Sequence, residues 1–370
     1  NGATYSGNVQ ADGSWSVSVP PSALGALTAS NYTVSATVND KAGNPGSTSH
    51  NLAVDTTAPV LTINTVAGDD IINDAEHAQA LVISGTSSGG EAGDVVSVVL
   101  NGKTYTSTLD ASGNWSVGVP AADVTALGSG AQTITASVSD RAGNSDDASR
   151  TVTVSLSAPV ISINTIAGDD VINATEHAQA QIISGSATGA ATGSAVTVTI
   201  GTNTFTTVLD ASGNWSVGVP AADVTALGSG PQTVTATVTD AAGNSDNETH
   251  TVTVNLAAPT IGINTIATDD VINATEKGAD LQISGTSNQP AGTTITLTLN
   301  GQNYTATTDA AGNWSTTVPA SAVGALGEAS YTVTANVTDS AGNSNSASHN
   351  VQVNTALPGV TLNPVASDDI

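Results

Sequence analysis

The chain has 370 residues and a formal net charge of -26, with 31 acidic side chains against 5 lysines and arginines. Such a negative surface repels nucleic acid and anionic membranes, so we expect no nucleic-acid partner and no direct membrane insertion. No apolar run approaches the roughly 18 residues that span a bilayer, no cysteine is present to form a disulfide, and no segment resembles a signal peptide. Because both ends fall inside repeated segments, we expect a piece of a longer chain.

A repeat of about one hundred residues organises the sequence. The four tryptophans Trp15, Trp115, Trp215 and Trp314 keep this step, and the segment LDASGNWSVGVPAADVTALGSG occurs unchanged at 109–130 and 209–230. We expect half a repeat at 1–57, whole repeats at 58–157, 158–257 and 258–356 (repeats 1, 2 and 3), and the start of another at 357–370. A hundred residues is the length of a domain, so the pattern predicts an array of domains.

Within repeat 1 the predicted elements are strands joined by tight turns. In chain order we expect strands at 60–65, 81–85 and 95–100, a turn at 101–104, a further strand, a turn at 110–114 and a strand carrying Trp115. A helical turn within 120–130, a strand at 132–139, a turn at 140–144 and a last strand through 151–154 complete the repeat. Apolar residues alternate with threonine and serine, which is typical of half-buried strands. Seven such strands predict an all-β, immunoglobulin-like antiparallel sandwich, with Trp115 in its core.

An acidic loop follows the first strand of each repeat: GDDIINDAEH from Gly68, GDDVINATEH from Gly168 and TDDVINATEK from Thr268. Two carboxylates about 4 Å apart repel by about 1 kcal/mol in water, and we see nothing basic nearby to neutralise the paired acids. If the strands alternate in direction, the loop faces the D-x-x-G-N turns of the following repeat. Carboxylate and carbonyl oxygens are ligands that Ca²⁺ prefers, so we predict calcium at the junctions between repeats.

The loops and turns supply the candidate metal ligands. In the loops they are Asp69, Asp70, Asn73, Glu76, Asp169, Asp170, Asn173, Glu176, Asp269, Asp270, Asn273 and Glu276, and in the turns they are Asp140, Asp240, Asp339, Asp210 and Asp309. Turn capping is the alternative for all five turn aspartates, because an aspartate can accept hydrogen bonds from its own turn; metal ligation is favoured over it for Asp140, Asp240 and Asp339 but not for Asp210 and Asp309. For Asn73 and Glu76 the alternative is that they shape the loop and do not touch the ion.

Four motifs together resemble the bacterial immunoglobulin-like repeats of giant, calcium-binding surface adhesins of the SiiE-like, Bap-like and RTX types. They are YTVTANVTDSAGN (331–343), D-x-x-GNWS-x-x-VPA, VDTTAP (54–59) and DDVIN-x-x-E, and they cover essentially the whole chain. The resemblance implies type I secretion to the bacterial cell surface. It also implies an extended rod, stiffened by Ca²⁺, that contacts the host-cell surface or a biofilm matrix through other parts of the protein. Thr268 and Lys277 depart from the pattern but leave the acids intact.

Two other functions compete with a structural rod. An enzyme is not expected, because none of the five histidines keeps a fixed serine or carboxylate partner through the repeats. His77 and His177 are interpreted as solvated loop residues, with metal ligation as the alternative. The alternative is a binding module, in which the repeats themselves bind a glycan or a protein receptor. Ligand sites usually gather exposed aromatic side chains, and aromatics make up only 3% of this chain, which favours the rod.

Overall fold

The computed structural model describes residues 2–362, so the last eight residues of the segment expected at 357–370 lie outside the described part. By their contacts the residues form two compact units: residues up to Ala158 together with Thr239–Ser245, and Pro159–Val238 together with the residues from Asp246 on. Among the described residues, no helix is long and apolar enough to cross a membrane.

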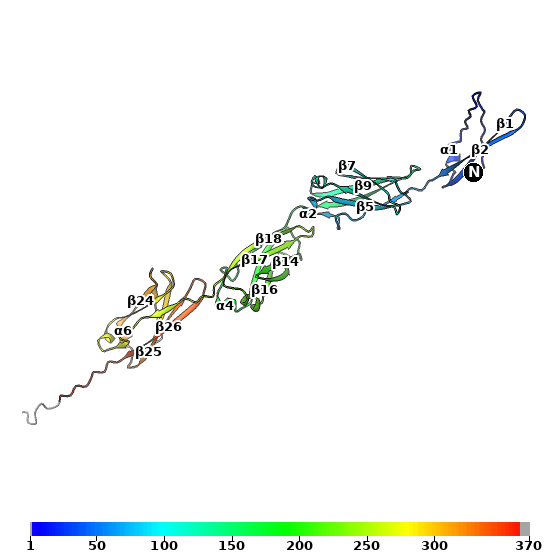
Figure 1. Ribbon diagram of the computed structural model, residues 1–370. Coiled ribbons are helices and arrows are strands. Elements are labelled where there is room, and N and C mark those ends of the chain that lie inside the picture. Colours follow the sequence, from blue (N-terminus) through cyan, green and yellow to red (C-terminus); the bar gives the residue numbers. More distant parts are fainter. Residues whose placement is uncertain (1, 363–370) are drawn as a thin grey trace, which may run out of the picture. The chain divides into compact units, whose positions relative to one another are not determined.

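Repeat 1, in the first unit, folds as two sheets (Figure 1). The smaller sheet has the order β3 (Val60–Leu61), β5 (Leu81–Ser88) and β8 (Asn114–Val119). The larger has the order β4 (Ile71–Ile72), β10 (Ser145–Val154), β9 (Gly130–Ser139), β6 (Val95–Leu100) and β7 (Lys103–Thr108). Side chains of both sheets, among them Ile83 and Ile134, share one buried core. The predicted immunoglobulin-like sandwich is therefore confirmed.

Alternation places the apolar side chains of β9 inward as predicted. Ile134, Ala136 and Val138 are buried, whereas Thr135 and Ser137 are exposed. Successive side chains of a strand point to opposite faces of its sheet, so one strand can line the core and face water at once.

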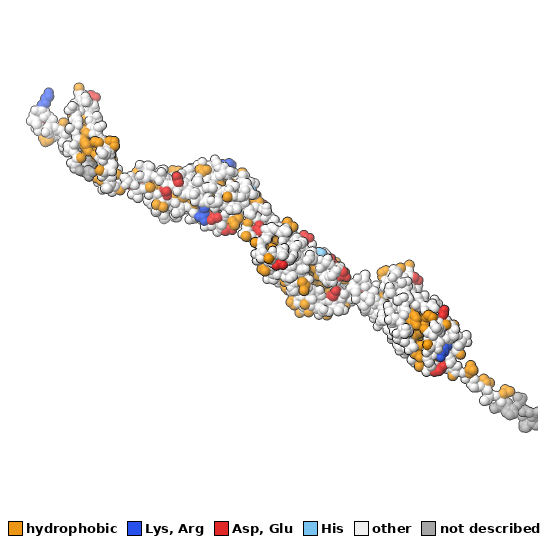
Figure 2. Space-filling model, turned by 180° about the vertical axis from the view of Figure 1, so that it is seen from behind, with side chains coloured by type: hydrophobic (Ala, Val, Ile, Leu, Met, Phe, Trp, Pro, Cys, Tyr) orange, Lys and Arg blue, Asp and Glu red, His pale blue; other side chains and the backbone are white. Residues whose placement is uncertain are grey.

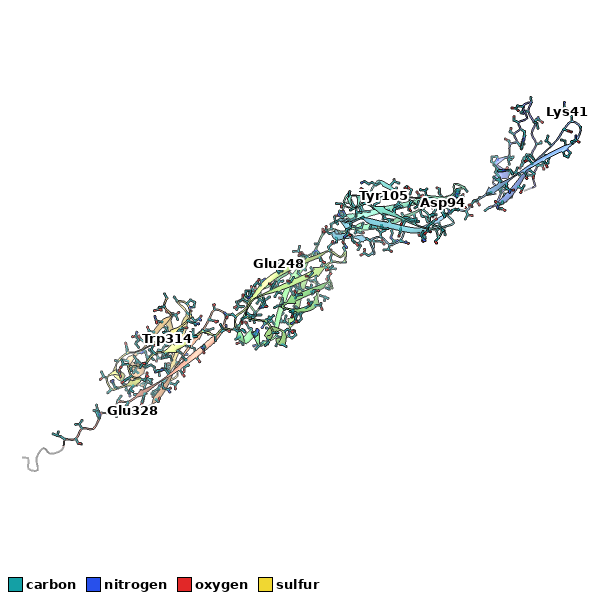
Figure 3. All side chains as sticks on the ribbon, in the orientation of Figure 1. Lys41, Asp94, Tyr105, Glu248, Trp314 and Glu328 are labelled. Atoms are coloured by element: carbon teal, nitrogen blue, oxygen red, sulfur yellow. The ribbon has the colours of Figure 1, made fainter. Side chains whose placement is uncertain are left out.

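Trp115 anchors the core, as the sequence predicts, with only 3% of its surface exposed. It lies directly opposite Gly85 in the register of β5 and β8. A methyl group built on Gly85 would come 2.6 Å from Cζ2 of Trp115 and 1.9 Å from the carbonyl oxygen of Thr62. The glycine therefore makes room for the indole ring. Trp314 is buried in the same way in repeat 3 (Figure 3).

The first strand departs from the prediction of one strand at 60–65. β3 ends at Leu61, although the N–H of Asn64 still bonds to the carbonyl oxygen of Ser84. The chain then bends through the positive φ angles of Ala67 and Asp70 and crosses to the larger sheet. There β4 pairs in parallel with the end of β10. This crossing adds an eighth strand to the expected seven and carries the acidic loop to the end of the sandwich where β10 leaves it.

Repeats 2 and 3 have the same strand order. Repeat 2 contains β11 (Val160–Ile163), β12 (Val171–Ile172), β13 (Gln181–Thr188), β14 (Ala195–Ile200), β15 (Asn203–Val208), β16 (Asn214–Val219), β17 (Gly230–Thr239) and β18 (Ser245–Val254). Repeat 3 contains β19 (Ile261–Ile263), β20 (Val271–Ile272), β21 (Leu281–Ser287), β22 (Thr294–Leu299), β23 (Gln302–Thr307), β24 (Asn313–Val318), β25 (Ser330–Thr338) and β26 (Ser344–Val353).

Short helices lie at two positions of the repeat. The predicted helical turn is confirmed as α3 (Ala121–Val124), α5 (Ala221–Thr225) and α6 (Ala320–Gly324). The other position, inside the acidic loop, was not expected to be helical and holds α2 (Asp74–His77), α4 (Ala174–His177) and the 3-10 turn η1 (Glu276–Gly278).

Residues 2–57 contain α1 (Pro21–Leu24) and a two-stranded sheet of β1 (Ser30–Asn39) and β2 (Pro45–Val54). Trp15, at the position of the buried Trp115, is 54% exposed. The strand β5, which covers Trp115 in repeat 1, has no counterpart within these residues. Figure 2 accordingly shows hydrophobic side chains gathered on the surface of this part.

Candidate functional site

The second aspartate of each acidic loop turns toward the last strand of its own repeat. Asp170 adopts φ 62°, and its Oδ1 accepts hydrogen bonds from the backbone N–H of Ile166 at 2.8 Å and from His250 Nε2 at 2.7 Å. Asp270 makes the same contacts with Ile266 and His349, each at 2.7 Å.

Arg150 holds the corresponding position in repeat 1. Its Nε and Nη2 donate to the two carboxylate oxygens of Asp70 at 2.6 and 2.5 Å, and its Nη1 donates to the carbonyl oxygen of Ile63 at 2.9 Å. The inner aspartate of each loop therefore has a basic or imidazole partner.

Two sequence interpretations are corrected by these contacts. The expectation that nothing basic lies near the paired acids is wrong for Asp70, and the expectation that no histidine keeps a carboxylate partner is wrong for His250 and His349. The partner stands about 80 positions later in the chain and is brought close only by the pairing of the loop with the last strand. One signal could have revealed it, because Arg150, His250 and His349 occupy the same position of three repeats.

These contacts favour the charged form of the inner acids. The guanidinium of Arg150 is the main cause that lowers the pKa of Asp70, followed by the backbone N–H of Val66. For Asp170 the backbone N–H of Ile166 lowers the pKa most, with a smaller contribution from His250. Hydrogen bonds to an ionised carboxylate stabilise it against protonation.

The first aspartate of each loop is exposed and has different partners. Asp69, Asp169 and Asp269 each accept one hydrogen bond through Oδ1, from the backbone N–H two residues further on, at 2.9, 3.0 and 3.1 Å. Within residues 2–362, Oδ2 of these side chains accepts no hydrogen bond. The adjacent acids thus do not share one environment. Both oxygens of Asp70 are engaged by Arg150, whereas Asp170 and Asp270 use only Oδ1 and, like the outer acids, keep a free Oδ2.

Asn173 and Glu176 form a capping box around the start of α4. Asn173 Oδ1 accepts from the N–H of Glu176 at 3.0 Å, and Glu176 Oε2 accepts from the N–H of Asn173 at 3.0 Å. Asn73 with Glu76 and Asn273 with Glu276 make the same reciprocal bonds. This geometry gives both residue types a loop-shaping role and leaves one glutamate oxygen available.

The aspartates of the D-x-x-G-N turns cap their own turns. Asp339 Oδ1 accepts from the N–H groups of Ala341 at 3.0 Å and Asn343 at 2.8 Å. Asp309 makes the same pattern with Ala311 and Asn313, each at 2.8 Å. Asp140, Asp210 and Asp240 accept from their own turns in the same way. Turn capping, the alternative for Asp210 and Asp309, therefore explains their local contacts.

Each repeat has two D-x-x-G-N turns, and in repeats 2 and 3 the second of them reaches the acidic loop of the preceding repeat. In the second unit, Asn343 Oδ1 accepts from the N–H of Ala174 at 2.8 Å, which joins the Asp339 turn to the loop of Asp169 and Asp170. In the first unit, Asn244 Oδ1 accepts from the N–H of Asp74 at 2.9 Å. No hydrogen bond in the described part of the second unit joins the Asp309 turn to this loop.

The oxygen donors suit calcium by type but are not gathered into a site. In residues 2–362, no group of three acidic or histidine side chains lies close enough to hold a metal ion. In the loop of repeat 2, Asp169, Asp170 and Glu176 each keep one carboxylate oxygen that accepts no hydrogen bond from the described residues. Asp339 lies in the turn that bonds to this loop through Asn343. Calcium takes six to eight oxygen ligands, so these groups would need water or backbone carbonyls besides.

His77 and His177 are half-buried, and the interpretation of both as solvated loop residues is wrong. Nε2 of His77 lies 3.0 Å from the carbonyl oxygen of Leu127, and Nε2 of His177 lies 3.0 Å from that of Leu227. Each ring ties the short helix of the acidic loop to the helical turn that precedes the next-to-last strand.

Acid is expected to weaken the folded chain below about pH 4. The pKa values of Asp70, Asp170 and Asp270 are lowered by folding, so their contribution to stability is complete above the ordinary aspartate pKa and is lost as pH falls through the lower folded pKa. Urea unfolding in about 0.15 M salt, which screens long-range repulsion, should show a midpoint that changes little from about pH 7 to 5 and falls at about pH 3. A midpoint that rises at about pH 3 would mean that relief of the net negative charge dominates.

The chain is similar to bacterial immunoglobulin-like domains and to solved structures of bacterial adhesins. The family model for the bacterial Ig-like domain matches residues 59–156 and 262–355. A solved structure of a Ca²⁺-stabilized adhesin, which helps an Antarctic bacterium reach out and bind ice, is 37% identical over 96% of this chain and 88% of its own, with a TM-score of 0.46.

Two further structures are similar. One, from work on the host cell surface retention of a 1.5-MDa bacterial ice-binding adhesin, is 33% identical over 82% of this chain and 100% of its own, with a TM-score of 0.46. The other, a tetra-tandem repeat from the extending region of a large adhesion protein, is 26% identical over 95% of this chain and 88% of its own, with a TM-score of 0.38. No curated protein matches the chain.

Proposed function

Because the chain belongs to the bacterial immunoglobulin-like domain family, we propose that it is a non-enzymatic stalk segment of an adhesin at the bacterial cell surface. In this proposal the repeats form an extended spacer, and other parts of the protein contact a host cell or a biofilm matrix. The sequence identity with adhesins supports the role. The contact that joins Asn343 to Ala174 carries it, because consecutive repeats that bond to each other are what a load-bearing spacer requires.

The core composition also supports a spacer. The tryptophans of repeats 1 to 3 are buried, so they offer no exposed ring on which a sugar could stack. Their burial leaves the alternative function, direct binding of a glycan or receptor by the repeats, without an observation in its favour.

Calcium at the junctions is the second element of the proposal. The candidate ligands are the free oxygens of Asp169 and Glu176 in the acidic loop and the Asp339 turn that bonds to this loop through Asn343. Asp70 is assigned a positioning role, since Arg150 engages both of its oxygens, whereas Asp170 and Asp270 use only Oδ1 and add their free Oδ2 atoms to the candidates. The net charge of -26 supports a cation, because an ion bound at a junction would lower the mutual repulsion of the carboxylates around it.

Calcium binding can be measured by titration calorimetry on the whole chain. Extracellular modules bind Ca²⁺ with Kd values of about 10⁻⁴–10⁻³ M, so we expect saturable binding in this range. Asp169→Asn should weaken the site between repeats 2 and 3 by about tenfold or more, the effect typical of losing a group that supports a metal.

The matched control is Asp309→Asn, which removes an aspartate from a turn of the same type that has no bond to the loop. It should leave the Kd unchanged. The calcium element is wrong if the wild-type chain binds no Ca²⁺ at about 10 mM, tenfold above the weakest expected Kd. It is also wrong if both variants weaken binding equally.

A further inference from the structure

We propose that the asparagine ending the last turn of each repeat, Asn343 in repeat 3 and Asn244 in repeat 2, is a latch that fixes the junction with the preceding repeat without a metal ion. This goes beyond the calcium proposal, because none of the bonds of the latch involves a cation. The partner that the latch recognises is the backbone of the preceding repeat's acidic loop and of the linker that follows its last strand.

Asn343 is only 5% exposed, and both the oxygen and the nitrogen of its side-chain amide make hydrogen bonds. Its Oδ1 accepts from the N–H of Ala174 at 2.8 Å, and its Nδ2 donates to the carbonyl oxygen of Asn255 at 3.0 Å and to Asp339 Oδ2 at 3.3 Å. One amide therefore joins the loop, the linker and its own turn.

The linker residue completes a closed chain of bonds. The N–H of Asn255 donates to the carbonyl oxygen of Ile172 in the preceding repeat at 3.0 Å, while its carbonyl oxygen accepts from Asn343. Both backbone groups of the linker residue are thus satisfied, one by each repeat. The peptide groups on both sides of Asn255 are therefore held, one by each repeat, so the linker cannot act as a free hinge while these bonds persist.

The same arrangement occurs independently in the first unit. Asn244, also 5% exposed, accepts from the N–H of Asp74 at 2.9 Å and donates to the carbonyl oxygen of Ser155 at 3.0 Å. The N–H of Ser155 donates to the carbonyl oxygen of Ile72 at 3.0 Å. Asp74 and Ser155 differ in type from Ala174 and Asn255, yet the bonds persist because they use only backbone groups. The latch therefore requires asparagine on one side and no particular side chain on the other.

The glycine before the asparagine allows the close approach. Gly342 and Gly243 have positive φ, and a methyl group on either would come 3.0 Å from Nδ2 of Asn173 or Asn73 in the loop. Gly143, whose turn meets no such loop among the described residues, has nothing within 4 Å.

Aspartate cannot replace the asparagine. The amide supplies a donor and an acceptor, whereas a carboxylate supplies acceptors alone. In Asn343→Asp the new oxygen would face the carbonyl oxygen of Asn255 and the carboxylate of Asp339, both of which it would repel.

Spin-label distance measurements on the whole chain test the latch. The chain has no cysteine, so Thr206→Cys in β15 and Thr305→Cys in β23, both exposed, can be labelled alone. In chelator we expect the distance distributions of Asn343→Ala and Asn343→Asp to be about twofold broader or more than that of this labelled parent. The aspartate variant keeps the size of the side chain, and circular dichroism checks that both variants fold.

Asn313→Ala is the matched control, because Asn313 makes the same bonds to Asp309 inside its own turn but none to another repeat. It should leave the distribution unchanged. The proposal is overturned if, in chelator, the distance distribution of Asn343→Ala is no broader than that of the parent. It is also overturned if Asn313→Ala broadens the distribution as much as Asn343→Ala does. Addition of Ca²⁺ separates the latch from the calcium proposal. If Ca²⁺ narrows none of these distance distributions, the calcium proposal fails and the latch proposal is unaffected.

Discussion

Replacing Gly185 by alanine will destabilise repeat 2 by about 3 kcal/mol. The new methyl carbon would lie 1.9 Å from the carbonyl oxygen of Ser162 and 2.7 Å from Cζ2 of Trp215. Neither atom can easily move, because one belongs to the paired strand and the other to a ring that is 3% exposed. Overpacking a core costs about 1–3 kcal/mol, and a clash with backbone belongs at the upper end of that range.

Gly218→Ala is the matched control for this substitution. Gly218 lies in β16, paired with β13, and a methyl group there would meet nothing within 4 Å. In calorimetric unfolding of the whole chain, Gly185→Ala should lower the midpoint temperature of one transition by about 4–8 °C per kcal/mol of destabilisation. Gly218→Ala should change the midpoint temperatures little. Equal effects of the two variants would mean that the loss of glycine flexibility, and not the contact with Trp215, decides stability.

The sheets of this fold could be predicted well because alternation is a local property. In β9 each threonine or serine between apolar residues marks the exposed face, and the structure follows it. The crossing of the first strand could not be predicted in the same way. Alternation does not say which sheet a strand joins, and the bend depends on positive φ at Ala67 and Asp70, of which alanine rarely adopts this conformation.

The sequence predicts where the acidic loop lies, but not the contacts that its side chains make. Strand direction correctly places the acidic loop against a turn of the following repeat, as the bond between Ala174 and Asn343 shows. The inner acids, however, gain partners such as His250 only through tertiary pairing. Asn343 was missed because Asn313 ends an identical turn motif, and nothing local distinguishes the asparagine that is buried at a junction from the one that stays exposed.

Removal of calcium is expected to shorten the chain, because the proposed ions neutralise carboxylates that otherwise repel at each junction. Three repeats joined freely have a root-mean-square end-to-end distance about 1.7-fold smaller than three repeats in line, by square-root scaling. The bonds of Asn244 and Asn343 restrict the linkers, so the wild-type chain should lose only part of this factor.

Small-angle X-ray scattering of the whole chain, in calcium and then in chelator, tests the calcium-stiffened stalk most directly. About 0.15 M salt keeps the Debye length near 8 Å, so that general repulsion between repeats is screened. The predicted result is a maximum dimension that falls in chelator and recovers when Ca²⁺ is restored. A maximum dimension that stays the same after calcium is removed would contradict the account.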